Sequence, residues 1–253
     1  MPFLTLDTPL VYSLKPRIIS RGFTVGVEQE KRVVAGTVWH SQASSGMRPL
    51  LLIGHQETEH KDASEVHDWM HIMCGKYGFV VAAIDGPIHG QRRVGTTEED
   101  LLKKEFDQLW NDGDESISPM VLDWKLTVDA LCELTEVDSR CIGYFGLSMG
   151  TAYGLEVVAT DLRISAAILG QWGTHRAHQE RQLKAARRIN CPLEFYVFEK
   201  DMNLKYQKEL FDTFRSNEKE WHTYPKITLL KNSKTIETIT NFFVVQLLDR
   251  YLY

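Results

Sequence analysis

Residues 141–150 read Cys-Ile-Gly-Tyr-Phe-Gly-Leu-Ser-Met-Gly, and this stretch decides the fold. Its first five residues belong to an apolar run that is typical of a strand buried on both faces of a parallel sheet. The next five, Gly146-Leu147-Ser148-Met149-Gly150, match the pattern Gly-x-Ser-x-Gly, and a helix is predicted over residues 151–160. A strand, a short turn and a helix in this order predict a sharp bend that exposes the hydroxyl of Ser148.

This bend has the features of a nucleophile elbow, in which a serine is held on a strained turn. The flanking glycines let neighbouring backbone approach without a clash against Cβ atoms. The N-terminus of the following helix favours negative charge, and the backbone N–H of Met149 would help to stabilise an oxyanion. We therefore predict that Ser148 is a nucleophile and that Met149 is an oxyanion donor.

Apolar runs and helical spacings alternate along the rest of the chain, which predicts an α/β fold with a mostly parallel sheet flanked by helices. An antiparallel hairpin is expected at its N-terminal side, from strands at 17–27 and 31–39. The polar stretch 91–117, with a helix expected over 98–110, predicts a lid-like insertion within a single domain of residues 1–253. The other predicted strands are 49–53, 79–84, 140–147, 164–169, 193–198 and 220–224, and the other predicted helices are 62–76, 119–135, 151–160, 177–188, 204–215 and 235–252.

The composition and net charge of the chain argue against nucleic-acid-binding and membrane-spanning classes of protein. The chain has 253 residues, of which 43% are hydrophobic and 25% charged, as in ordinary globular proteins. A net charge of −5 argues against a polybasic surface, so we expect no nucleic-acid partner. The sequence contains no run of about 18 apolar residues that would predict a membrane span. Residues 1–7 lack the pattern of a secretory signal, which favours a cytoplasmic protein without a membrane partner.

Cofactor motifs are not found in the sequence. It has no Gly-x-Gly-x-x-Gly pattern and no P-loop lysine. The cysteines are widely spaced without a Cys-x-x-Cys pair, so we expect reduced thiols and no metal site. These are Cys74, Cys132, Cys141 and Cys191. The expected partner is a small-molecule substrate that is bound without a cofactor, and a homodimer is left open.

Three segments together resemble the α/β-hydrolase superfamily, and within it the dienelactone-hydrolase-like and small-esterase branch. They are the elbow, the segment Leu52-Ile53-Gly54-His55 and the segment Ala83-Ile84-Asp85-Gly86-Pro87-Ile88-His89-Gly90. The order of strands and helices agrees, and the resemblance runs from about Val33 to the C-terminus. It implies the α/β-hydrolase fold and a substrate that is an ester or lactone of a small molecule.

The resemblance also implies positions for the rest of the site. The second oxyanion N–H maps onto the turn His55-Gln56, and we assign it to Gln56. Relatives commonly have glycines after this histidine, whereas this sequence continues with Gln56, Glu57 and Thr58. The acid of the triad should follow the strand at 193–198, where Asp201 has the expected position and Glu199 is the alternative. Asp201 could instead cap the helix that follows it.

The catalytic histidine is missing from its expected place. Relatives carry it between the last strand and the last helix, soon after a Tyr-Pro-like segment, which corresponds to a position near Thr228. His222 lies six residues earlier, and no histidine follows it, so His222 is a weak candidate for the base. Without a base, a serine hydroxyl is a weak nucleophile.

Three explanations remain open for the missing base. The chain could be a pseudo-hydrolase that binds a small molecule or partner, or that uses its pocket for a lyase or isomerase step. Another histidine that follows a strand end, His89, His175 or His178, could replace the base. A local reading-frame change over residues 226–234 could hide the histidine, because suitable codons for these residues can spell one in a neighbouring frame.

The favoured function is a serine hydrolase that acts on a small ester or lactone. Its degenerate triad would consist of Ser148 and Asp201 with no obvious histidine. The residues expected to contact the substrate are His55, His89, Trp172 and His175.

Overall fold

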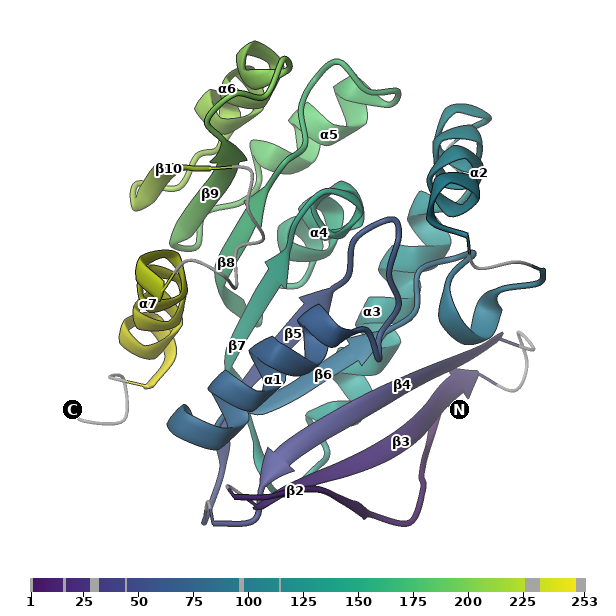
Figure 1. Ribbon diagram of the computed structural model, residues 1–253, viewed down its shortest axis with the longest axis vertical. Helices are drawn as coiled ribbons and strands as arrows, with labels where there is room; N and C mark the ends of the chain where they lie inside the picture. The colour runs from purple at the N-terminus through teal and green to yellow at the C-terminus, as the bar shows by residue number, and fades with distance from the viewer. Residues whose placement is uncertain are drawn as a thin grey trace.

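A computed structural model describes residues 2–15, 17–27, 32–43, 45–95, 98–113, 115–225 and 233–248 of the chain. The described strands are β1 (Pro2–Leu6), β2 (Leu10–Leu14), β3 (Arg17–Val27), β4 (Arg32–Ser41), β5 (Arg48–Gly54), β6 (Val80–Ile84), β7 (Val137–Gly146), β8 (Ile164–Gly170), β9 (Leu193–Phe198) and β10 (Lys219–Tyr224). They form one sheet in the order β1-β3-β4-β6-β5-β7-β8-β9-β10, with β2 paired to β3 (Figure 1). Strands β6, β5, β7, β8, β9 and β10 each run parallel to their neighbours in this series. Strands β1, β2, β3 and β4 pair antiparallel with one another.

Helices cover both faces of this sheet. They are α1 (Ser64–Tyr77), α2 (Glu99–Asn111), α3 (Ile117–Leu131), α4 (Met149–Thr160), α5 (Gln179–Ala186), α6 (Leu204–Thr213) and α7 (Ser233–Phe243), with a 3-10 turn at Gly90–Arg92 and a π-helical turn at Val244–Leu248. No helix of the described residues combines the length and the apolar character that crossing a lipid bilayer requires.

The strand β5 shows why the sheet is buried on both faces. Leu50 and Leu52 belong to the core beneath α3 and α4, whereas Leu51 and Ile53 belong to the core beneath α1 and α7. All four side chains are at most 2% exposed. Side chains alternate between the faces of a strand, so a continuous apolar run serves two cores at once.

The expected fold class is confirmed, with differences at the ends of elements. The predicted hairpin corresponds to β3 and β4, and two further strands, β1 and β2, precede it. Strand β2 is mostly exposed, and its side chains lack the alternation of apolar and polar residues that marks a half-buried strand. The predicted helix 235–252 is described as far as residue 248, and its last described residues form the π-helical turn.

The elbow depends on close contact between backbones. A Cβ atom on Gly150 would lie 2.4 Å from the carbonyl oxygen of Gly54, at the end of β5. The hydroxyl of Tyr144 donates to the carbonyl of Gly150 over 2.8 Å and fills the space beside it. Glycine is required at position 150 because the first turn of α4 packs directly on β5.

Candidate active site

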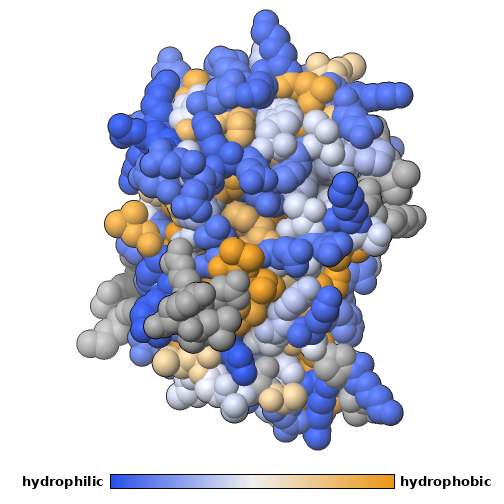
Figure 2. Space-filling view, turned by 90° about the vertical axis from the view of Figure 1, so that its left-hand side faces the viewer, coloured by the Kyte–Doolittle hydropathy of each residue, from blue (hydrophilic) through white to orange (hydrophobic). Residues whose placement is uncertain are grey.

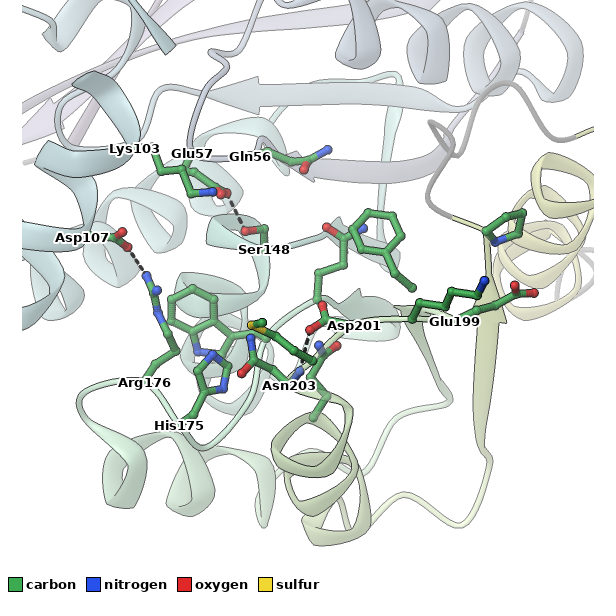
Figure 3. Close-up of a pocket in the computed structure, with 17 residues that line it drawn as sticks. Gln56, Glu57, Lys103, Asp107, Ser148, His175, Arg176, Glu199, Asp201 and Asn203 are labelled. Carbon is green, nitrogen blue, oxygen red and sulfur yellow. Dashed lines mark hydrogen bonds and ion pairs between the residues drawn. The ribbon is translucent and has the colours of Figure 1, made fainter. Parts of the chain in front are cut away.

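A cavity of about 710 Å³ opens at the carboxyl ends of the parallel strands (Figure 3). Ligands of open α/β sheets bind at these ends. The lining residues come from the loops after β5, β7, β8 and β9, from α2 and α6, and from the end of β10. They are Gln56, Glu57, Lys103, Asp107, Ser148, Gln171, Trp172, His175, Arg176, Phe198, Glu199, Lys200, Asp201, Met202, Asn203, Gln207 and Pro225.

Ser148 connects β7 to α4 with φ of 53° and ψ of −116°. L-residues rarely adopt this conformation, and the strain is what a nucleophile elbow requires. The backbone N–H of Ser148 donates to the carbonyl of Gly170, at the end of β8, over 3.0 Å. The turn is therefore fixed against the neighbouring strand, and the side chain faces the cavity.

The hydroxyl of Ser148 donates to Oε2 of Glu57 over 2.5 Å (Figure 3). A hydrogen bond from a hydroxyl to a carboxylate is charge-assisted and stronger than one between neutral groups. Glu57 lies on the loop after β5, the same loop on which the second oxyanion donor is expected. The structure therefore pairs the serine with a carboxylate.

The loop after β5 is held by several contacts around Gln56. Its carbonyl accepts from Nδ1 of His55 over 2.8 Å and from the N–H of Glu59 over 3.1 Å. Its side-chain amide donates to Glu65 on α1 over 2.9 Å. Burial and the charge of Glu65 raise the pKa of Glu59 to about 8, which favours its neutral form near neutral pH. Gln56 is thereby fixed on the cavity wall beside Ser148.

His55 is a structural residue in this loop. The backbone N–H of Gly86 donates to its Nε2 over 2.8 Å, so Nε2 must be unprotonated and Nδ1 must carry the hydrogen that Gln56 accepts. Burial, followed by the neighbouring His89, lowers the pKa of His55 to about 3. A neutral imidazole with both nitrogens occupied joins the loop after β5 to the loop after β6.

We expect the free energy of unfolding to fall as the pH is lowered from about 6.5 towards 3. In this range the unfolded chain binds a proton on His55 and the folded chain does not, so protonation favours unfolding. His55 alone contributes a slope of up to about 1.4 kcal/mol per pH unit to the dependence of the free energy of unfolding on pH. Urea denaturation at a series of pH values measures it. The variant His55→Gln should show a shallower slope than the wild type, and an equal slope would contradict this role.

His89 holds the backbone of Glu57 in place. Its Nε2 donates to the backbone carbonyl of Glu57 over 2.8 Å, and its ring packs edge-on against His55 at 5.1 Å. Burial lowers the pKa of His89. His55 and His89 were expected to contact the substrate, but neither is among the cavity-lining residues. They act instead on the position of Gln56 and Glu57.

The loop after β9 brings Asp201 to the cavity, as the sequence predicts. Its Oδ1 accepts the backbone N–H of Asn203 over 2.7 Å, so one carboxylate oxygen stabilises the turn that begins α6. The N-cap of α6 is Asn203, so Asp201 is not the helix cap that the sequence offered as the alternative, and its role as the acid of a triad stays a prediction. Glu199 also lines the cavity.

Of the described histidines, His175 is the one that lines the cavity with Ser148. Burial and Arg176 lower its pKa, and the charge of Asp201 acts in the opposite direction. Nε2 of His178 instead bonds the carbonyl of Trp110 over 2.7 Å. His222 lies on β10 beside Glu194 and does not line the cavity. Thr228 and the segment of the proposed reading-frame change up to residue 232 lie outside the described residues.

Helix α2, in the predicted insertion, contributes to the cavity wall. Lys103 and Asp107 line the cavity, and Arg176 from the loop after β8 pairs with Asp107. Trp110, on the buried face of α2, packs edge-on against Trp172 at 5.0 Å. Burial of one large apolar side chain stabilises by about 1.5–3 kcal/mol, so this contact fixes the helix over the site. Trp172 lines the cavity as expected.

Glu57 is the site residue that sequence reasoning missed. It appeared there only as a departure from the glycines of related proteins. The available signal was an acidic side chain three residues after a buried strand, on the loop that faces the elbow. Its contact with Ser148 joins positions 91 residues apart, and only the folded chain reveals it.

The sequence matches no protein-family model and no curated protein. The structure is similar to a PEG-bound cold-adapted esterase from an Arctic intertidal metagenomic library, with 27% identity, a TM-score of 0.78, and coverage of 91% of this chain and 94% of that one. It is also similar to an acetyl xylan esterase from Paenibacillus sp. R4, with 17% identity, a TM-score of 0.69, and coverage of 97% and 89%. A third similar structure is a dienelactone-hydrolase-like promiscuous phosphotriesterase, P91, from metagenomic libraries, with 16% identity, a TM-score of 0.67, and coverage of 91% and 99%.

The chain therefore has the α/β-hydrolase fold, and its structural neighbours are esterases and dienelactone-hydrolase-like proteins. This agrees with the branch that the sequence motifs resemble. The esterases among these neighbours support a hydrolase that acts on esters.

Proposed function

We propose that the protein hydrolyses small carboxylic esters or lactones with Ser148 as its nucleophile. The observation that carries this proposal is the strained backbone of Ser148 together with its hydrogen bond to Glu57, inside the cavity at the strand ends. A strained residue at a cavity is an expected feature of a working site. The esterase neighbour at 27% identity supports the same reaction class.

The proposed reaction begins with attack of Oγ of Ser148 on the ester carbonyl. As the bond to carbon forms, the hydroxyl proton passes to Glu57, which already accepts the hydrogen bond. Negative charge develops on the carbonyl oxygen, and the backbone N–H groups of Met149 and Gln56 would stabilise it. Met149 begins α4, and the first N–H groups of a helix have no acceptor within it.

The second half of the reaction releases the product. The proton held by Glu57 passes to the leaving alkoxide as the ester bond breaks, and an acyl group stays on Ser148. Water then attacks this acyl group, with Glu57 as the base, and the free acid and serine are restored. Carboxylates are ordinarily weaker bases than imidazoles, so we expect a slower enzyme than one with a complete triad.

Asp201 and His175 face the same cavity and form a second polar pair on its wall. Burial and Arg176 lower the pKa of His175, and the charge of Asp201 opposes part of this shift, so the two groups interact electrostatically. We assign to this pair the binding of the polar part of the substrate. The apolar part would lie against Trp172 and Phe198, which also line the cavity.

The function is tested by the hydrolysis of 4-nitrophenyl acetate and of a small lactone by the purified protein. We expect saturable release of product above the rate in buffer. The second candidate function is a silent binding protein, and it is favoured by the absence of an imidazole bonded to Ser148 among the described residues. A background rate with both substrates, together with saturable binding of either one, would favour this second candidate.

A further inference from the structure

One face of strands β9 and β10 carries a group of metal-ligating side chains away from the cavity. Glu194 lies on β9, and Glu220 and His222 lie on β10. The two strands are parallel, with Glu220 opposite Glu194 and His222 opposite Tyr196. Alternate residues of a strand share a face, so all four side chains project from the same side of the sheet.

The distances among these side chains fit a small divalent cation. Nε2 of His222 lies 3.5 Å from Oε1 of Glu194 and 3.5 Å from Oε2 of Glu220. The three ligand atoms all lie within 4.8 Å of one another. Zinc binds nitrogen and carboxylate oxygen at about 2.0–2.2 Å in a tetrahedron, which places neighbouring ligands about 3.4 Å apart.

The imidazole nitrogen Nε2 of His222 has no hydrogen-bond partner among the residues that the structure describes. The atom is buried, and its contacts with the two carboxylates do not have the geometry of a hydrogen bond. A buried polar atom without a partner costs free energy, and each such atom needs an explanation. A metal ion between the three side chains would supply the missing contact.

Electrostatics at this position also favour a cation. Glu194 and Glu220 form no ion pair with lysine or arginine in the described part of the chain. The neighbouring Lys219 turns to the opposite side, where its Nζ donates to the carbonyl of Phe214 over 2.7 Å. Within the described residues, these two close carboxylates therefore have no lysine or arginine to compensate their charge.

An outer partner orients one of the ligands. The hydroxyl of Tyr196 donates to Oε2 of Glu194 over 2.7 Å, which leaves Oε1 directed at His222. The ring of Tyr196 stacks on the imidazole of His222 at 4.7 Å and fixes its plane. Outer hydrogen bonds of this kind hold the ligands of metal sites in position.

We propose that Glu194, Glu220 and His222 form a zinc site that joins β9 to β10, with the fourth position open to water. The Glu220 side chain is 74% exposed, which gives an ion access from solvent. This edge of the sheet lies on the left-hand side of Figure 1, and Figure 2 shows that face as mostly hydrophilic around a smaller hydrophobic patch. The site is independent of the hydrolytic function, because none of its ligands lines the cavity.

Calorimetric titration of the metal-free full-length protein with ZnCl₂ tests this site. We expect one ion per chain, bound at micromolar concentration, and no binding of Mg²⁺, which prefers an all-oxygen octahedral site. The variants Glu220→Gln and His222→Gln should lose binding by more than about a hundredfold, since loss of an outer partner alone costs roughly 10–100-fold. Tyr196→Phe should weaken binding by about tenfold. Glu220 is exposed, so its variant is expected to fold.

Two controls distinguish this site from other histidines. His71→Gln on α1 and His175→Gln in the cavity should both bind zinc as the wild type does. Bound zinc should also raise the Tm of the wild type by about 5 °C at a hundredfold excess over the Kd, and leave that of Glu220→Gln unchanged. Failure of the wild type to bind zinc, or binding that survives in both Glu220→Gln and His222→Gln, would overturn the proposal.

Discussion

Replacement of Ser148 by alanine should lower the kcat/KM for 4-nitrophenyl acetate by at least about 10³-fold. The hydroxyl supplies the atom that attacks the carbonyl, and among the described residues no neighbouring side chain on the elbow can replace it. Alanine retains the Cβ atom, so the strained backbone at this position is not relieved by the change. The loss should therefore appear in catalysis and not in folding. Steady-state kinetics measure the first, and thermal denaturation measures the second.

A matched control is Ser64→Ala at the start of α1, where the serine is exposed and does not line the cavity. This variant should retain the activity of the wild type. Equal activity of Ser148→Ala and wild type would mean that hydrolysis occurs elsewhere or without covalent catalysis. The strained turn at Ser148 would then have no catalytic role.

Replacement of Glu57 by glutamine should lower kcat by about 10²–10⁴-fold with a smaller change in KM. Glutamine has nearly the same size and can still accept a hydrogen bond from Ser148, but it cannot take up the hydroxyl proton. The variant therefore separates a role in proton transfer from a role in packing. Measurement of kcat and KM with the same aryl ester gives the two effects separately.

The control for Glu57→Gln is Glu180→Gln on α5, an exposed glutamate that does not line the cavity. It removes one negative charge from the chain and should leave the kinetics unchanged. If Glu57→Gln keeps the activity of the wild type while Ser148→Ala loses it, the base is a different group. His175→Gln would then be the next variant, because His175 lines the same cavity.

The sequence predicted the fold well because its strands are buried on both faces. The run from Leu50 to Ile53 has no polar position, and only a central strand between two helical layers accommodates such a run. The elbow was equally clear, since its glycines and its place between strand and helix are local features. The mixed sheet and its flanking helices follow from these signals.

Strands β1 and β2 were missed because they lie at the exposed edge of the sheet. Each of them pairs with β3 alone, and neither shows a strong alternation of apolar and polar residues in the sequence. These two strands form because they pair with β3, and a pairing between separate strands leaves little local signal in the sequence.

The candidate site was predictable only in part. Ser148 and Asp201 follow strands at fixed distances, and the structure brings both to one cavity. The roles of His55 and His89 were not predictable, because the sequence pattern of a histidine after a strand is the same whether its side chain contacts a substrate or supports a loop. His222 was a candidate base by its position in the sequence, but its strand register directs it towards Glu194.

The most direct test of Ser148 as an active nucleophile is its covalent capture. The purified protein is treated with an aryl phosphonate that reacts with activated serines, and the intact mass and the modified peptide are determined by mass spectrometry. We expect one adduct per chain on the peptide that contains Ser148, no adduct in Ser148→Ala, and slower labelling in Glu57→Gln. An unlabelled wild type, or an adduct on any other residue, would contradict nucleophilic catalysis by Ser148.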